Sequence, residues 1–463
     1  MWSLVALALM PTVLSAASPE DIAARGRELL AAYAAADAEF RGGWGYSDGK
    51  SSGTLAWAEA NFLRRYMKAY YASRDPYWLG KIAMHFDRMI QSLADPDGDG
   101  FLAWRDIVYS VGRGKIVEAA APEGLTLTPP EQAIWYRNGG KDVTGHKYRI
   151  EFVAPTRIRV TDLTAAKTIA ELDYSGRLTI TQIPGLKFRL SGPGKKGARW
   201  TVETMAPQYC EFQVHDGMVT YPIAEFIEAV YSDPALRERF GAKADRYAKL
   251  IHDHFLLKWG KTWREFDDGT GLYCFTKNPT QRYPGFSLPH NQYLALARTW
   301  LVMQALPGVA DRALYRDRAE KMARFFKRHL RLNDGAYVWH YWDPLPGENA
   351  NRYIEDYSHA TIDISFVIEA RDRGIVFTDD DMRRFASTWV DVMWNGDLAK
   401  PRFGRRVDTN EGDKLAWWEW MQLGRFDPRA LRLAVAVFEA AGERPTMAPE
   451  VLCLLARCGY KIN

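Results

Sequence analysis

The sequence predicts a mainly α fold, an (α/α)6 toroid of helical hairpins with an inserted antiparallel β-sandwich-like module. Helical segments recur in pairs, in which an apolar, aromatic-rich helix is followed by a charged, amphipathic one. One segment of alternating apolar and polar residues interrupts the pairs. The expected organisation is a signal peptide at 1–17, toroid segments at 19–111 and 213–463, and the β module at 112–212.

The first helix of each pair is apolar nearly all round, which is typical of a helix covered on both sides. These inner helices are expected to start near Thr54, Met218, Leu288, Ser358 and Asp413. The outer helices keep a charged face and are expected to start near Pro76, Pro234, Asp311, Thr378 and Asp427. Ser, Thr or Asp precedes four of these outer helices as an N-cap, and Pro follows in three of them.

The two ends of the chain supply one more pair. Residues 19–40 form an amphipathic helix of the outer type, and residues 446–458 form an apolar helix of the inner type. Their pairing would close a ring of six inner and six outer helices, whereas an open helical solenoid would leave them apart. We expect the ring, because the two terminal helices are of complementary types.

The interrupting segment, 112–212, is rich in Gly, Pro, Thr and Lys. It contains the alternating runs KYRIEFV, RIRVTDL, GRLTITQI, LKFRL and RWTVETM. Alternation with a period of two, bounded by Gly, Pro and Asp, predicts antiparallel strands. The sequence therefore predicts an inserted β module.

The composition limits the class of protein. Of the 463 residues, 47% are hydrophobic and 25% are charged, which excludes disordered, collagen-like and polytopic membrane chains. A net charge of +4 is too small and too mixed to indicate a nucleic-acid partner. The 17 Trp, 23 Tyr and 21 Phe residues could fill a large core or line a sugar-binding cleft.

The N-terminus has the pattern of a secretory signal peptide. Residues 4–17 are apolar and end in Ser15-Ala16-Ala17, which fits cleavage near Ala17. The alternative is a buried N-terminal helix. The run is too short for a membrane span, and no later apolar stretch reaches about 18 residues. We therefore expect a secreted or periplasmic protein.

The helical pairs and the segments LAWAEA, LPHNQY and YIEDYSHA resemble the (α/α)6-toroid carbohydrate-active enzymes. This group includes uronate polysaccharide lyases, C5-epimerase-like proteins and six-hairpin glycosidases. The resemblance covers about 19–111 and 213–458 and is not tied to one family. It implies a catalytic cleft formed by the loops at one end of the barrel, but a fold alone does not define the reaction.

An acidic loop has the spacing of a calcium site. Asp95, Asp97 and Asp99 fall at loop positions 1, 3 and 5, Phe101 can offer its carbonyl oxygen, and Asp106 stands at position 12. This spacing brings several oxygen atoms round one point, as a hard cation requires. We expect bound Ca²⁺ with a structural role; the alternative is an Asp/Gly turn.

The densest polar segment directly precedes an expected inner helix. It contains Arg352, Glu355, Asp356, Tyr357 and His359, which are catalytic candidates. Single members could cap the helix or fill the core. The concentration of ionisable groups within so short a segment favours a catalytic site.

Further candidates lie at the starts of other inner helices and in one aromatic segment. His290 and Asn291 are catalytic candidates at one such start. The substrate-binding candidates are Trp57, Glu59, Asp216, Tyr221, Trp339, His340, Trp342 and Trp417. In a toroid these starts meet at one end, so we expect a shared cleft lined by Glu59, Asp216, His290, Asn291, Tyr357, His359 and Asp413.

These residues fit more than one reaction. A uronate lyase must neutralise a carboxylate, abstract the proton alpha to it and protonate the leaving oxygen. Asn291, His290 or Arg352 could neutralise the carboxylate. Tyr357 or His359 could act as the base, and Tyr357 could act as the acid. A C5-epimerase would use similar groups and return the proton to the opposite face.

A glycoside hydrolase instead requires two carboxylates about 5–9.5 Å apart. Glu355 or Asp356 could serve with Glu59, Asp216 or Asp413. A non-catalytic glycan-binding protein would keep the aromatic residues and need neither arrangement. The Tyr, His, Asn and Arg content favours an exported polysaccharide lyase that cleaves a uronic-acid-containing glycan by β-elimination. The sequence defines neither the sugar nor the oligomeric state.

Overall fold

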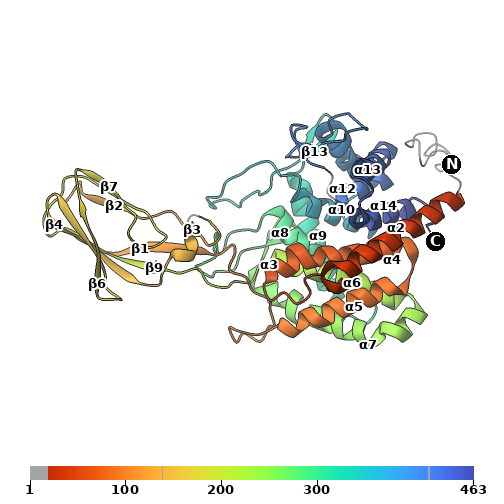
Figure 1. Cartoon of the computed structure of the whole chain (residues 1–463), viewed down its shortest axis with the longest axis horizontal. Coiled ribbons are helices and arrows are strands. Elements are labelled where there is room, and N and C mark those ends of the chain that lie inside the picture. Colours follow the sequence, from red (N-terminus) through yellow and green to blue (C-terminus); the bar gives the residue numbers. More distant parts are fainter. Residues whose placement is uncertain (1–18, 138, 416–417, 463) are drawn as a thin grey trace. The chain divides into compact units, whose positions relative to one another are not determined.

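The computed structural model describes residues 19–137, 139–415 and 418–462 (Figure 1). The expected signal peptide and Trp417 lie outside these residues. None of the described helices combines the length and the apolar character that crossing a membrane requires.

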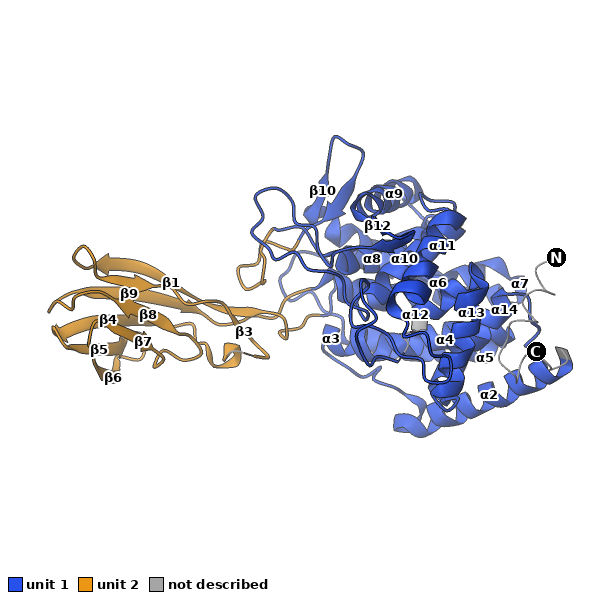
Figure 2. Cartoon of the chain, turned by 90° about the horizontal axis from the view of Figure 1, so that it is seen from above, with its two compact units in different colours: residues 1–104, 212–274, 286–463 blue, residues 105–211, 275–285 orange. Residues whose placement is uncertain are grey.

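The chain divides into two compact units, which Figure 2 colours separately. Unit 1 comprises residues 1–104, 212–274 and 286–463, and unit 2 comprises residues 105–211 and 275–285. From the sequence, residues 275–285 are expected in the second helical segment. In the structure they belong to unit 2, and their backbone carbonyl groups accept hydrogen bonds from its other residues. For example, the Val111 N–H donates to the Thr280 carbonyl oxygen at 2.8 Å.

Unit 1 is helical. Its longer helices are α2 (Pro19–Glu39), α4 (Ala60–Ser73), α5 (Pro76–Met89), α6 (Gln213–Ser232), α7 (Pro234–Leu250), α8 (His290–Met303), α9 (Arg312–His329), α10 (Ala360–Asp372), α11 (Asp379–Ser387), α13 (Pro428–Ala440) and α14 (Ala448–Arg457). The short α-helices are α3 (Ser52–Thr54) and α12 (Trp418–Met421). The π-helical segments are Leu55–Glu59, Ile251–Leu256 and Thr388–Met393. The 3-10 segments are Phe40–Gly43, Ile90–Ser92, Leu257–Thr262, Gln422–Arg425 and Pro445–Met447.

The expected N-caps of four outer helices are confirmed. Asp75, Asp233 and Asp427 each accept a hydrogen bond from a first-turn N–H, and Pro follows each of them. Thr378 and Asp381 form a reciprocal capping box at α11. These caps satisfy N–H groups that have no partner within the helix.

A series of helices forms the centre of unit 1. α4 packs against α6, α6 against α8, α8 against α10, α10 against α12 and α12 against α14, and α14 also contacts α4. α6 and α8 cross closely at Gly217, where an added Cβ would lie 2.3 Å from the backbone nitrogen of Leu296. The close crossing fixes the N-terminal turns of α6 and α8 relative to one another.

Two short hairpins also belong to unit 1. They are β10 (Trp263–Glu265) with β11 (Gly271–Tyr273), and β12 (Arg331–Asn333) with β13 (Ala336–Val338). The second hairpin leads directly into the segment that contains Trp339 and His340.

Unit 2 contains two antiparallel sheets. The six-stranded sheet has the order β3-β1-β9-β4-β5-β6, and the three-stranded sheet has the order β2-β8-β7. The strands are β1 (Val111–Ala120), β2 (Thr126–Thr128), β3 (Ala133–Ile134), β4 (Lys147–Ala154), β5 (Arg157–Asp162), β6 (Lys167–Asp173), β7 (Arg177–Ile180), β8 (Phe188–Ser191) and β9 (Arg199–Met205). A 3-10 turn, Gly140–Asp142, lies between β3 and β4. Ile150 and Val160 of the larger sheet share one core with Phe188 and Leu190 of the smaller sheet.

The expected fold class, a mainly α (α/α)6 toroid with a β-sandwich-like insertion, is wrong. The structure is 47% helical and 18% strand, and its six-stranded antiparallel sheet is curled. Helical periodicity dominates the sequence pattern, but it does not reveal how strands pair and curl. It also misses the hairpins of unit 1, because three-residue strands are too short to show alternation. The chain is mixed α and β.

Candidate functional site

An irregular strip, residues 354–359, leads into α10. The Glu355 N–H donates to the Trp339 carbonyl oxygen at 3.0 Å, and the Tyr357 N–H donates to the Arg405 carbonyl oxygen at 3.0 Å. These bonds hold the strip between two other segments. Its side chains therefore have defined positions.

Asp356 and His359 form a dyad in this strip. Nδ1 of His359 hydrogen-bonds to Oδ2 of Asp356. Oδ1 accepts from the Ser358 N–H at 2.8 Å, the Ser358 hydroxyl at 2.6 Å and the His359 N–H at 3.0 Å. Burial alone would raise the pKa of Asp356, but the hydrogen bonds from His359 and Ser358 hold this pKa well below its usual range. The side chains of Asp356 and His359 are 36% and 42% exposed.

This geometry assigns the roles of the imidazole nitrogens. Because Nδ1 of His359 faces the ionised carboxylate, it carries the proton of the neutral ring. Nε2 is then the basic nitrogen. An exposed imidazole oriented by a carboxylate can act as a general base and return the proton as a general acid.

A buried carboxyl pair adjoins the dyad. Glu355 and Asp363 are fully buried, and their carboxyls lie close enough to interact electrostatically. Burial raises the pKa of both carboxyls, and the negative charge of Asp363 and Asp356 adds to the effect at Glu355. Because both pKa values are raised, a proton on one of the two carboxyls is favoured, and it would relieve the repulsion between them. Trp339 Nε1 donates to Asp363 at 2.9 Å.

Glu355, Asp356 and His359 could also hold a metal ion. One ligand atom of each lies within 4.8 Å of the others. However, Glu355 would have to bind the ion in its ionised form, and burial opposes that charge. The arrangement is therefore better suited to proton transfer than to metal binding.

A stack of two tyrosine rings lies on one side of the imidazole. The Tyr341 and Tyr353 rings stack with their centroids 4.9 Å apart, and the Tyr341 ring lies 5.2 Å from that of His359. Tyr353 is exposed, so the stack offers aromatic surface beside the dyad. Tyr357, in contrast, is 2% exposed and packs among core aromatic rings. The sequence assigned the acid–base role to Tyr357, but Tyr353 has the better access to solvent.

A buried histidine is linked to an exposed arginine through Asp343. Nε2 of His290 lies 3.0 Å from Oδ2 of Asp343, and Nε of Arg352 donates to Oδ1 at 2.6 Å. Burial lowers the pKa of His290, which keeps the ring neutral. Burial alone would raise the pKa of Asp343, but the hydrogen bonds from His290 and Arg352 hold it well below its usual range. Asp343 thus positions the guanidinium of Arg352, which is 56% exposed.

The remaining expected residues around α8 are more enclosed. Asn291 is buried, and its Oδ1 has no hydrogen-bond partner among the described residues. His340 lies 3.4 Å from Asp343. Trp342 is buried and donates to the Ser287 hydroxyl at 3.0 Å. These side chains support the segment around His290 and Asp343.

Glu59 and Asp216 occupy separate buried networks. Glu59 hydrogen-bonds to His85 at 2.5 Å, and Asp216 forms an ion pair with Lys258 at 2.9 Å. Burial raises the pKa of both carboxyls, and these partners oppose the effect. No direct contact among the described residues joins either carboxylate to the dyad. Asp413 is linked more closely to the strip. It forms an ion pair at 3.7 Å with Arg405, whose carbonyl oxygen accepts a hydrogen bond from Tyr357 of the strip.

Two further binding candidates are also separate from the dyad. Trp57 is partly exposed, and its ring lies 5.4 Å from that of His215. Tyr221 is buried and donates to Glu369 at 2.9 Å. Tyr221 of α6 therefore belongs to a cluster of polar side chains that includes Glu369, near the C-terminal end of α10.

The predicted calcium loop fits a cation only in part. The carboxylates of Asp95, Asp97 and Asp99 lie within 4.8 Å of one another and are exposed. Asp95 already accepts three backbone hydrogen bonds, and Asp99 pairs with Lys261 at 2.5 Å. The Phe101 N–H donates to Asp99 at 3.0 Å, which is the geometry of an Asp turn. Asp106 belongs to unit 2 and accepts from two backbone N–H groups that follow it. Calcium binding stays a prediction.

Sequence reasoning missed Asp343 and Asp363. Asp343 directly follows the aromatic segment that ends at Trp342, and Asp363 lies one helical turn after His359. The spacing of Asp363 is a detectable signal, because residues four apart share a helix face. The link between Asp343 and His290 spans 53 positions and has no local signal.

Comparisons with known proteins do not classify the chain. No family model matches, and no curated protein matches. Among solved structures, FlgL of Xanthomonas campestris aligns at 13% identity with a TM-score of 0.17, covering 45% of this chain and 75% of FlgL. The flagellar junction protein FlgL from Legionella pneumophila aligns at 11% identity with a TM-score of 0.17, covering 42% and 75%. These similarities are too weak to bear on fold or function.

Proposed function

We propose that this chain is a carbohydrate-active enzyme that cleaves a uronic-acid-containing glycan by β-elimination at the Asp356–His359 dyad. The observation that carries the proposal is the exposed imidazole oriented by an ionised carboxylate. Abstraction of a proton alpha to a carboxylate requires such a base.

Nε2 of His359 takes the proton from C5 of the uronate, and the electron pair forms the C4–C5 double bond as the C4–O4 bond breaks. The Tyr353 hydroxyl protonates the departing oxygen. Afterwards His359 releases the proton that it took to solvent, and Tyr353 regains a proton from solvent. Arg352, held by Asp343, pairs with the substrate carboxylate and stabilises the charge that develops on it.

An acidic substrate is supported by the charge around the strip. Arg352, Arg405 and Arg406 are all more than half exposed, and the latter two flank the strip by backbone pairing. Guanidinium groups suit carboxylates because their planar fork matches the carboxylate oxygens. A neutral glycan would not use this arrangement.

Hydrolysis by a carboxylate pair fits this site less well. It requires a protonated carboxyl and an ionised one that both reach the sugar. The raised pKa of Glu355 favours its protonated form, but its side chain is fully buried, and Asp356 is hydrogen-bonded to His359 and Ser358. The exposed proton-transfer group of the strip is the imidazole.

The test is the absorbance of unsaturated uronate products during incubation with a panel of uronic-acid polysaccharides. We expect the absorbance to rise with the native protein and the rate to fall by at least about 100-fold in His359→Gln, as for a lost general base. His146→Gln is the matched control, because His146 forms a similar dyad with Asp162 at 2.7 Å in unit 2 and is 37% exposed. Its rate should be unchanged.

Three outcomes would contradict this proposal. New reducing ends without absorbance would indicate hydrolysis. Deuterium incorporated at C5 in heavy water without cleavage would indicate epimerisation. An equal loss in the His146 and His359 variants would show that the dyad of the strip has no special role.

A further inference from the structure

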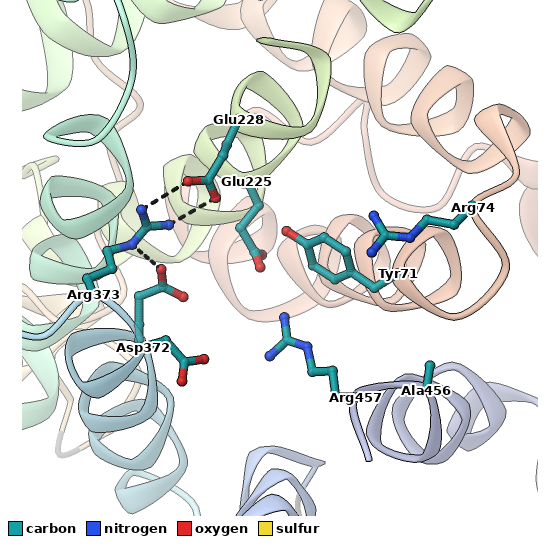
Figure 3. Close-up of a pocket in the computed structure, with 9 residues that line it drawn as sticks. Tyr71, Arg74, Glu225, Glu228, Asp372, Arg373, Ala456 and Arg457 are labelled. Carbon is teal, nitrogen blue, oxygen red and sulfur yellow. Dashed lines mark hydrogen bonds and ion pairs between the residues drawn. The ribbon is translucent and has the colours of Figure 1, made fainter. Parts of the chain in front are cut away.

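A polar pocket of about 460 Å³ lies at the C-terminal ends of the central helices of unit 1 (Figure 3). Its walls come from α4, α6, α10 and α14. None of its lining residues belongs to the strip at 354–359, which precedes the N-terminus of α10.

Part of the charge in this pocket is internally paired. Arg373 donates to both carboxylate oxygens of Glu228 at 2.9 Å and also pairs with Glu369 at 2.5 Å. Asp372 pairs with Arg425 at 2.7 Å. Figure 3 shows the bonds between Arg373 and Glu228 along one wall of the pocket.

Glu225 has no such partner. It is 3% exposed, and its Oε2 has no hydrogen-bond partner among the described residues. Figure 3 shows its carboxyl directed toward the space that the Tyr71 ring and the Arg457 guanidinium also face. Burial raises the pKa of Glu225 to about 7. Leaving a buried carboxyl oxygen without a hydrogen-bond donor costs free energy of folding. A bound ligand that donates a hydrogen bond to Glu225 would remove this cost.

Two guanidinium groups, those of Arg74 and Arg457, also line the pocket. Arg457 lies over the Tyr71 ring at 5.0 Å, and Arg74 lies over the Tyr70 ring at 5.6 Å. Within the described chain, neither guanidinium has a carboxylate oxygen within 4.0 Å. Arginines at helix C-termini offset the helix dipole, but this effect does not account for the buried Glu225.

We propose that this pocket binds a small hydroxylated carboxylate, the class of sugar acids and hydroxy acids. Its carboxylate would pair with Arg457 and Arg74, and a hydroxyl would donate to Glu225. A simple anion would leave Glu225 without a donor, and a neutral sugar would leave both guanidinium groups without an acceptor. This inference does not depend on the dyad or on β-elimination.

The test is calorimetric titration of the whole protein with three probes: D-glucuronate, acetate and methyl glucoside. We expect glucuronate to bind at least about tenfold more tightly than either of the others, since each lacks one charge-assisted contact. Equal binding of glucuronate and acetate would overturn the role of Glu225. No heat with glucuronate at millimolar concentration would overturn the proposal as a whole.

Variants assign the binding to this pocket. Glu225→Leu and Arg74→Gln should each weaken glucuronate binding about tenfold or more, as expected for a lost charged hydrogen bond. Arg74 is exposed, so Arg74→Gln should fold even where the buried substitution does not. Arg432→Gln, at an exposed position of α13, is the matched control and should bind as the native protein does. Loss of binding in His359→Gln instead would place the ligand at the dyad and overturn the proposal.

Discussion

The carboxylate of Asp343 accepts hydrogen bonds from both His290 and Arg352. Asp343 is almost fully buried, so these hydrogen bonds replace its contacts with water. Because its folded-state pKa lies below the ordinary value of about 3.9, the ionised form stabilises the fold. This contribution is complete above about pH 4 and is lost as the pH falls toward the folded-state pKa.

We therefore expect Asp343→Asn to lower the free energy of unfolding at pH 7 by about 2 kcal/mol, the usual value for hydrogen bonds to a charged group. The difference from the native protein should narrow below pH 4, because the unfolded chain then binds a proton at this carboxyl while the folded protein still holds it ionised. Urea unfolding of both proteins at pH 7, 5, 4 and 3 measures this difference in the free energy of unfolding. Asp413→Asn, at an exposed position, should show little effect at any pH. A difference that stays constant down to pH 3 would contradict this explanation.

Individual site residues could be predicted where the pattern is local. Arg352, Glu355, Asp356 and His359 lie within eight consecutive positions, and the structure joins Glu355, Asp356 and His359 in one cluster. The role of Tyr357 could not be judged, because its burial depends on rings far along the chain. Long-range packing decides which member of a polar segment reaches solvent.

At the scale of elements, the crossing of α6 and α8 depends on a missing side chain. A Cβ on Gly217 would lie 2.3 Å from the Leu296 nitrogen and 2.4 Å from the Ala295 carbonyl carbon. Both are backbone atoms, so relief requires the helices to move apart. The N-terminal turns of these helices carry Asp216 and His290.

Gly217→Ala should therefore destabilise the protein by more than about 1 kcal/mol, although alanine favours a helix over glycine. Gly80→Ala is the matched control. Gly80 lies in α5 with no atom near the added Cβ, and the change should stabilise by about 0.4–1 kcal/mol. Chemical denaturation of both variants tests the pair. Equal changes in stability in the two variants would mean that the close crossing of α6 and α8 does not affect stability.

The helix starts were predictable because capping is local. Asp75, Asp233, Thr378 and Asp427 cap their helices through hydrogen bonds that span two or three residues. The close approach at Gly217 was not predictable, because it joins residues about 80 positions apart. Sequence patterns therefore locate elements more reliably than the contacts between them.

At the scale of the whole molecule, the two units have separate cores. Phe188 is fully buried in unit 2, and Phe366 is fully buried in α10 of unit 1. Compact units with their own cores can unfold as separate cooperative units. The interruption of helical periodicity at 112–212 indicated a second module, but it did not indicate that 275–285 also belongs there.

We expect Phe188→Ala to cost about 3–5 kcal/mol and to raise hydrogen exchange in the strands of unit 2. Exchange in α8 and α10 should stay unchanged. Phe366→Ala is the matched change in unit 1. It should raise hydrogen exchange in α8 and α10 and leave exchange in the strands of unit 2 unchanged. Uniform acceleration throughout the chain in both variants would show that the molecule unfolds as one cooperative unit.

The carboxyl pair of Glu355 and Asp363 also has a spectroscopic consequence. A proton shared between these two carboxyls would be strongly deshielded, and burial would slow its exchange with water. It should give an isolated magnetic resonance line far downfield of the amide envelope, which disappears in Asp363→Asn. This line would report that the strip beside His359 is correctly assembled, even before any substrate has been found.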